Sequence, residues 1–111
     1  MDKYNKDHVI SEYISAKKAR KEVVSERQAR KDVDDVLISI MNVLAKSKDS
    51  LPDKKNVRAR LQIVNFGSLE LRHVPARAHK NPQDPTAEPT IKPAHNNVVL
   101  STGRAFEETV N

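Results

Sequence analysis

Five of the chain's six prolines fall within residues 75–93, directly after a stretch that alternates apolar and polar residues as a β-strand does. Proline lacks the amide hydrogen that a β-ladder requires, so it is confined to strand edges, turns and bulges. The segment therefore cannot be a central strand. We expect it to form an exposed arm, in which prolines at the open edges prevent pairing with other chains.

Two short strands are expected before this arm and a third after it. Over residues 57–63, apolar side chains alternate with Arg58, Arg60 and Gln62, which predicts a strand with one apolar and one polar face. Gly67-Ser68 supplies a turn, and residues 69–73 alternate again. The apolar run at residues 98–100 is expected to return to the same sheet.

Helices are expected at both ends of the chain. Residues 6–21 carry apolar residues at helical spacing, with Asn5 or Asp7 as candidate N-caps. A second helix begins at Ser25, which forms a capping-box pattern with Gln28. Its apolar stripe runs along one face and consists of Ala29, Val33, Val36, Leu37, Ile40 and Leu44. Residues 46–56 are expected to be a mobile basic loop, and a last short helix starts at Ser101 or Thr102.

Composition indicates that one copy of this chain cannot fill a core alone. Its 111 residues include 37% hydrophobic but only 4% aromatic residues, and a chain this short buries a limited share of its surface. The stripe on the second helix therefore predicts a partner helix. There is no cysteine, the first ten residues do not resemble a signal peptide, and no apolar run approaches the roughly 18 residues that a membrane helix requires.

The positive charge is concentrated in one segment. The net charge is +5, and residues 51–82 alone carry seven Lys and Arg against two Asp and Glu, which also gives +5. A concentrated basic face is typical of proteins that bind a phosphate backbone. A solvated basic surface with no ligand is the alternative that charge alone leaves open.

Catalytic and metal-binding patterns are not found. His8, His73, His79 and His95 lack the close spacing of metal ligands, and two glycines cannot build a glycine-rich phosphate loop. We expect no enzymatic activity, metal, cofactor, small-molecule substrate or membrane partner.

Several short motifs occur in an order that is specific when they are taken together. These are Phe66-Gly67-Ser68, Asn81-Pro82-Gln83 and Gly103-Arg104-Ala105-Phe106, with Arg72, Arg77, Lys80, Ile91 and Pro93-Ala94 at matching places between them. With these motifs the chain resembles the HU and integration host factor family of bacterial DNA-bending proteins. The resemblance spans most of the chain.

The resemblance implies an α+β fold in which two copies of a single domain, residues 1–111, intertwine. Residues 1–50 would form a helical dimerisation body, 57–74 and 98–100 a three-stranded saddle sheet, 75–97 a long β-ribbon arm, and 101–111 a short C-terminal helix. The partner copy would be identical or a paralogue. The side chains expected in the dimer core are Val33, Val36, Leu37, Ile40, Leu44, Phe66, Leu69, Leu100 and Phe106.

The resemblance also implies that double-stranded DNA is the partner, bound through the minor groove with low sequence specificity and bent. The residues expected to contact DNA are Lys6, Arg58, Arg60, Arg72, Arg77, His79, Lys80, Asn81, Pro82, Gln83, Lys92 and Arg104. Pro82 is expected to intercalate between base pairs. Its alternative role is that of a turn residue, since Asn-Pro is a common turn signal.

Some positions depart from the family pattern. Val74 stands where a basic residue is usual, His79 where glycine is frequent, and the 46–56 segment is longer than usual. These departures keep a second function open, that of an HU-like protein-interaction or regulatory module with weak or lost DNA bending. The expected location is the cytoplasm, on the nucleoid, or a virion or host cytoplasm if the chain is phage-encoded.

Overall fold

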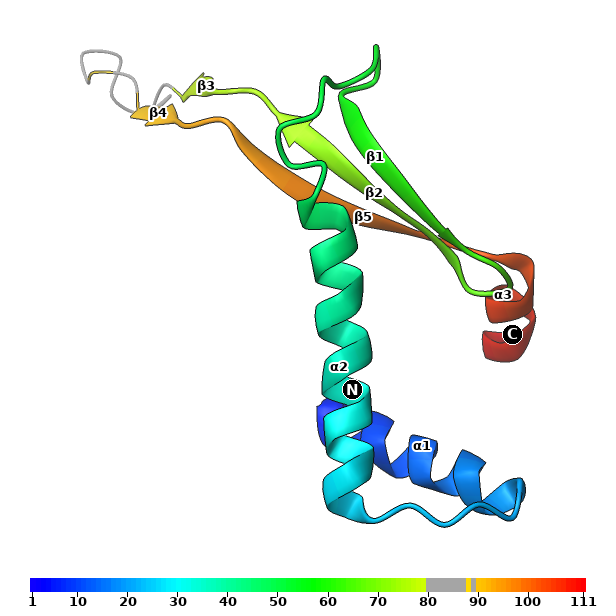
Figure 1. Ribbon diagram of the computed structural model, residues 1–111. Helices are drawn as coiled ribbons and strands as arrows, with labels where there is room; N and C mark the ends of the chain where they lie inside the picture. Colours follow the sequence, from blue (N-terminus) through cyan, green and yellow to red (C-terminus); the bar gives the residue numbers. More distant parts are fainter. Residues whose placement is uncertain (80–87, 89) are drawn as a thin grey trace. The chain divides into compact units, whose positions relative to one another are not determined.

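The computed structural model of the protein describes residues 1–79, 88 and 90–111 (Figure 1). The chain divides into two compact units, Met1–Asn42 and Val43–Asn111, each of which is described by itself. The described part has an α+β fold with antiparallel sheets, which confirms the fold class expected from the sequence. Four residues expected to contact DNA, namely Lys80, Asn81, Pro82 and Gln83, lie outside the described residues.

The first unit contains helix α1, Lys6–Ala19, and most of helix α2, Glu26–Ala45. Asn5 caps α1: its side-chain oxygen accepts from the Asp7 N–H at 3.0 Å, and its own N–H donates to His8 Nδ1 at 3.1 Å. The helix ends earlier than expected because Lys21 adopts a left-handed backbone with φ of 59°.

Only half of the expected capping box forms at the start of α2. Ser25 Oγ accepts from the Gln28 N–H at 3.1 Å, as the pattern predicts. The Gln28 side chain does not return to the cap, however, because it donates to the Asp32 carboxylate at 2.7 Å. The cap therefore satisfies one backbone donor with a side chain rather than two.

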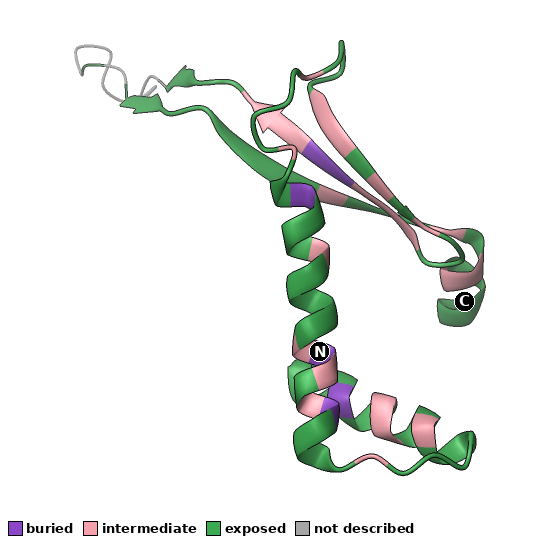
Figure 2. Ribbon diagram, in the orientation of Figure 1, coloured by how far each residue is buried: buried purple, intermediate pink, exposed green. Residues whose placement is uncertain are grey.

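The core of the first unit is small. Ile10, Ala29 and Val33 are buried, and Tyr13, Ile14 and Val24 pack partly buried against them. Most residues of α2 are exposed, as the green ribbon in Figure 2 shows. From Val36 onward the exposed residues include large apolar ones. The stripe expected on this helix is thus buried at Ala29 and Val33, exposed at Val36 and Leu37, and buried again at Leu44.

A three-stranded antiparallel sheet forms the centre of the second unit. It consists of β1, Val57–Ile63, β2, Gly67–Val74, and β5, His95–Thr102, in the order β1-β2-β5. Strand β5 is longer than the expected residues 98–100, because residues 95–97 before them and 101–102 after them also pair with β2. Since successive side chains point to opposite faces, Leu69 and its partners Leu61 and Leu100 share one face of the sheet.

Helix α3, Arg104–Val110, begins later than expected. Ser101 and Thr102, the expected helix start, are the last residues of β5, and Gly103 is the N-cap. The Gly103 N–H donates to the Phe66 carbonyl at 2.8 Å. The Phe66 ring meets the Phe106 ring edge-on with centroids 5.3 Å apart, so these contacts fasten α3 to the β1–β2 turn.

The arm begins after the last residue of β2, Val74, and returns to the main sheet at the first residue of β5, His95 (Figure 1). Strand β3, Arg77–His79, pairs antiparallel with β4, Thr90–Lys92. The expected β-ribbon arm is therefore present at its base. Within the described ranges, no helix has the length and apolar character that crossing a membrane requires.

Candidate nucleic-acid interface

Two arginines and one glutamate form a cross-strand cluster on the polar face of the main sheet. Glu70 on β2 accepts from Arg60 on β1 at 2.6 Å and from Arg72 on its own strand at 2.7 Å. The Glu70 side chain is only 11% exposed, whereas the Arg60 and Arg72 side chains are 61% and 43% exposed. Glu70 thus fixes two guanidinium groups side by side while leaving much of their surface open.

The electrostatics of this cluster favour an ionised Glu70. Hydrogen bonds from Arg72 first, and then from Arg60, hold the pKa of the Glu70 carboxyl below its usual range. The cluster therefore carries a net charge of about +1 at neutral pH. Sequence reasoning identified both arginines and missed Glu70. The available signal was its register position, since residue 70 faces residue 60 once the β1–β2 turn is placed. That turn lies at residues 64–66, and the expectation that Gly67-Ser68 forms it is wrong, because both residues pair with β1 as the start of β2.

Arg58 does not lie with Arg60, and the expectation that both belong to one polar face is wrong. The β1–β2 register shifts between Val57 and Ala59, which marks a β-bulge at Arg58. The Arg58 guanidinium lies 3.0 Å from His73 Nδ1 and donates to Asn96 Oδ1, also at 3.0 Å. His73 and Asn96 are cross-strand partners on the opposite face from Glu70.

The base of the arm presents two exposed cations. Arg77 on β3 and Lys92 on β4 are direct cross-strand partners, and neither has a carboxylate partner within the described part of the chain. They line an open groove of about 520 Å³ where the arm meets the main sheet; its other lining residues are Val74, Pro75, Ala78, Pro93, His95 and Asn97. His79 lies on β3 opposite Thr90.

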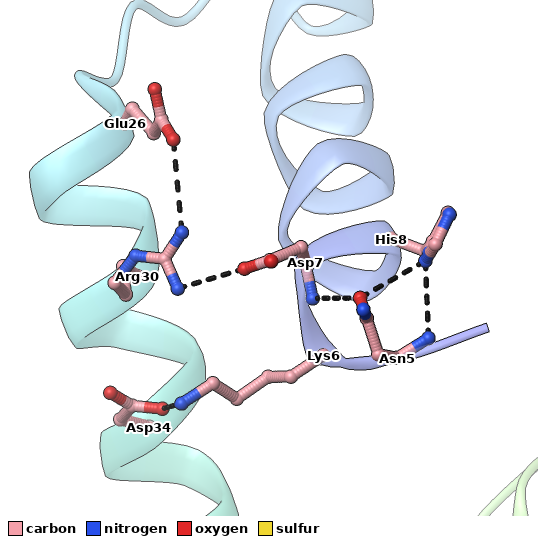
Figure 3. Close-up of polar contacts among 7 residues, drawn as sticks. All are labelled: Asn5, Lys6, Asp7, His8, Glu26, Arg30 and Asp34. Atoms are coloured by element: carbon pink, nitrogen blue, oxygen red, sulfur yellow. Dashed lines mark hydrogen bonds and ion pairs between the residues drawn. The ribbon is translucent and has the colours of Figure 1, made fainter.

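The remaining two candidate cations occupy surface ion pairs. Lys6 Nζ lies 2.8 Å from Asp34 on α2, beside a second bridge in which Arg30 contacts Asp7 at 2.9 Å (Figure 3). Arg104 lies 3.0 Å from Glu108 one helical turn away and is 92% exposed. Exposed pairs of this kind are weak and screened by salt, so they leave both cations available to another anion.

The nine side chains expected in a dimer core are distributed unevenly in the single chain. Val33 and Leu44 are buried, whereas Val36, Leu37, Phe66 and Leu100 are 60%, 44%, 40% and 46% exposed. Ile40, Leu69 and Phe106 are half-buried. In the described residues, no group of three or more His, Cys, Asp or Glu side chains is arranged to hold a metal ion.

Several known proteins are similar to this chain in sequence or in fold. A profile of the family described as "Bacterial DNA-binding protein" matches residues 5–111. Integration host factor subunit beta of Halorhodospira halophila is 35% identical over 83 residues, which cover 75% of this chain and 72% of that protein. DNA-binding protein HU-1 of Halalkalibacterium halodurans is 33% identical over 88 residues, covering 79% and 83%. A cocrystal structure of Anabaena HU with DNA matches with a TM-score of 0.66 and 27% identity, covering 96% and 97%.

Proposed function

Because the chain belongs to the family of architectural bacterial DNA-binding proteins that includes HU and integration host factor, we propose that it binds duplex DNA as a dimer, through the minor groove, and bends it with little sequence preference. The observation that carries this proposal is a second antiparallel strand pair that follows the main sheet. Strands β2 and β5 pair as far as Val74 and His95, and after short interruptions at residues 75–76 and 93–94 the chain pairs again as β3 and β4, with exposed Arg77 and Lys92 opposite each other.

The arm has the chemistry that a minor groove requires. Ala76 and Ala78 add little width to an extended backbone, and both are exposed. Arg77 and Lys92 supply charge for phosphates, and His79, Lys80, Asn81 and Gln83 continue the basic and polar sequence toward the tip. Minor-groove readout separates A·T from G·C pairs but little else, so low sequence preference follows.

Pro82 is the proposed wedge at the tip of the arm. Apolar wedges between base pairs are a device of minor-groove architectural proteins, IHF and HU among them. Proline suits this task because its ring is rigid and its φ is already fixed, so little conformational entropy is lost. Bending a short site by about 40–90° costs on the order of 1–6 kcal/mol. Phosphate contacts at Arg60, Arg72, Lys6 and Arg104 would offset that cost.

The proposed dimer rests on the exposed apolar surface of the single chain. Within the described residues no large side chain is fully buried, and four members of the expected core are at least 40% exposed. A second copy would cover this surface with its own α2 stripe and sheet face, which bury apolar area on both sides. The partner would be an identical chain or a paralogue.

Salt dependence of binding tests the proposal. If six to ten phosphates are contacted, the dissociation constant for a duplex should rise about 10³–10⁵-fold between 50 and 200 mM salt, because bound counterions are released. Mobility shift of a labelled duplex at graded salt measures this effect. Binding that is absent or insensitive to salt would instead favour the protein-interaction module, for which the partial neutralisation of Arg60 and Arg72 by Glu70 is the supporting observation.

A further inference from the structure

The segment between α2 and β1 is fastened to the sheet, although the sequence predicts a mobile loop there. We name residues 46–56 the connecting loop. Asn96 on β5 donates from Nδ2 to the Lys48 carbonyl at 3.1 Å, and Arg58 on β1 donates to the Ser50 carbonyl. The His73 N–H on β2 donates to the Asn56 carbonyl at 2.8 Å. All three strands of the main sheet therefore hold the backbone of the connecting loop.

The second half of the connecting loop is also organised by its own bonds. The Asp53 carboxylate accepts from the Lys55 N–H at 2.8 Å and from the Val57 N–H at 2.9 Å. These two hydrogen bonds hold the pKa of the Asp53 carboxyl below its usual range, and the bond from the Val57 N–H has the larger effect. The Asp53 N–H in turn donates to the Val57 carbonyl at 2.9 Å, which closes a tight turn before β1.

The attachment points lie at the end of the sheet from which the arm departs. His73 and Asn96 face each other across β2 and β5, and the next pair, Val74 with His95, is the last before the arm. The groove at the base of the arm is lined by His95 together with Arg77 and Lys92. The connecting loop is thus held at the end of the sheet from which the arm with Arg77 and Lys92 departs, through side chains on the face opposite to Glu70.

Four lysines of the connecting loop, Lys46, Lys48, Lys54 and Lys55, are exposed. None of them has an ion-pair partner in the described ranges, in contrast to Lys6, Arg60, Arg72 and Arg104. The two acidic residues of the loop are Asp49 and Asp53, and Asp53 is engaged by backbone amides. The loop therefore offers cations that need not leave another carboxylate in order to bind an anion.

We propose that the connecting loop is a further DNA-binding surface, which contacts the phosphate backbone of the duplex beside the base of each arm and lengthens the bound site. This inference rests on the proposed DNA binding and extends it to residues that the family resemblance does not assign. Because the strands already hold the loop backbone, binding does not have to order it, and less conformational entropy is lost than for a free lysine-rich segment.

The test compares two variants that lose the same charge. Lys54→Gln/Lys55→Gln removes two cations from the connecting loop, and Arg27→Gln/Lys31→Gln removes two exposed cations from α2. Because the proposed dimer carries the change in both copies, the loop variant loses four phosphate contacts, and the slope of log K against log salt should fall by about 3.6 at about 0.9 per contact. Binding near 0.1 M salt should weaken about 10²–10³-fold or more in the loop variant and far less in the α2 variant.

The outcomes separate this inference from the proposal on which it rests. A loop variant whose slope and affinity match those of the α2 variant, while the wild-type protein binds DNA with a steep slope, would overturn the role of the loop alone. A wild-type protein that does not bind a duplex would overturn the proposed function itself. Unchanged thermal melting of both variants, followed by circular dichroism, establishes that the comparison concerns binding rather than folding.

Discussion

Gly67→Ala is expected to destabilise the second unit by about 2–6 kcal/mol, a large part of the 5–15 kcal/mol that holds a typical domain folded. Gly67 has φ of 153°, a conformation that residues with a side chain rarely adopt. A Cβ at this position would also collide with the Ser101 carbonyl oxygen on β5. Relief requires β2 and β5 to separate at the pair formed by Gly67 and Thr102.

Gly103→Ala provides the matched control for this substitution. Its Cβ would meet backbone atoms of Phe66 and Gly67 at 3.3 Å, a tight contact that a shift of a few tenths of an ångström relieves, and its φ of −83° is open to any residue. We expect Gly103→Ala to lower the free energy of unfolding by about 1 kcal/mol or less. This loss measures the effect of adding a methyl group at a backbone contact close to Gly67. Urea unfolding of both variants measures the two losses of stability. Equal midpoints for the two variants would contradict the requirement for glycine at position 67.

Leu37→Asp is expected to abolish the proposed dimer. An uncompensated charge in a buried position costs about 3–5 kcal/mol, and a symmetric dimer contains two copies of the change. The dimer dissociation constant should therefore rise at least about 10⁴-fold, since each 1.4 kcal/mol corresponds to a factor of about ten. Leu37 is 44% exposed in the single chain, so the substitution acts mainly on what a partner covers.

Asp35→Asn on the same helix is the control, because Asp35 is already exposed and polar. Light scattering should give the mass of a dimer for the wild type and this control, and the mass of a monomer for Leu37→Asp. The melting temperature of the wild type should also rise with protein concentration, as linked dissociation and unfolding require. A Leu37→Asp protein that keeps a dimer's mass would show that this stripe is not the interface.

Periodicity was sufficient to predict most of the secondary structure. The alternation over residues 57–63 and 69–73 gave the two strands that become β1 and β2, and the proline cluster located the arm. Asn5 and Asp7 were both candidate N-caps of the first helix, since each carries a side-chain acceptor, and Asn5 is the one that caps it. The fold class followed from the order of these elements and from the family resemblance.

Features that depend on strand register were not predicted. A bulge is a single inserted residue, and alternation alone does not show that it turns Arg58 away from Arg60. The role of Glu70 as the ion-pair partner of Arg60 depends on the β1–β2 register, which places the two residues opposite each other. The connecting loop resembled a free polar segment because two of its anchors, His73 and Asn96, are distant in sequence and reach it only through the sheet.

The position of α3 was missed for a related reason. Ser and Thr are good N-caps, so Ser101 and Thr102 were expected to start the helix. Both residues instead extend β5 and pair with Ser68 and Gly67. Pairing with β2 is therefore preferred to helix capping at these two positions. Gly103 is the N-cap of α3 and makes no side-chain hydrogen bond.

Bending of a short duplex is the most direct test of the account, measured by energy transfer between dyes at the two duplex ends in dilute salt. The wild-type protein should bring the ends closer and raise the transfer efficiency. Pro82→Ala should still bind, through the cations at the arm base and on the sheet, but with much of the added transfer lost, because the kink requires the wedge. A duplex that stays straight when saturated with wild-type protein would contradict the account.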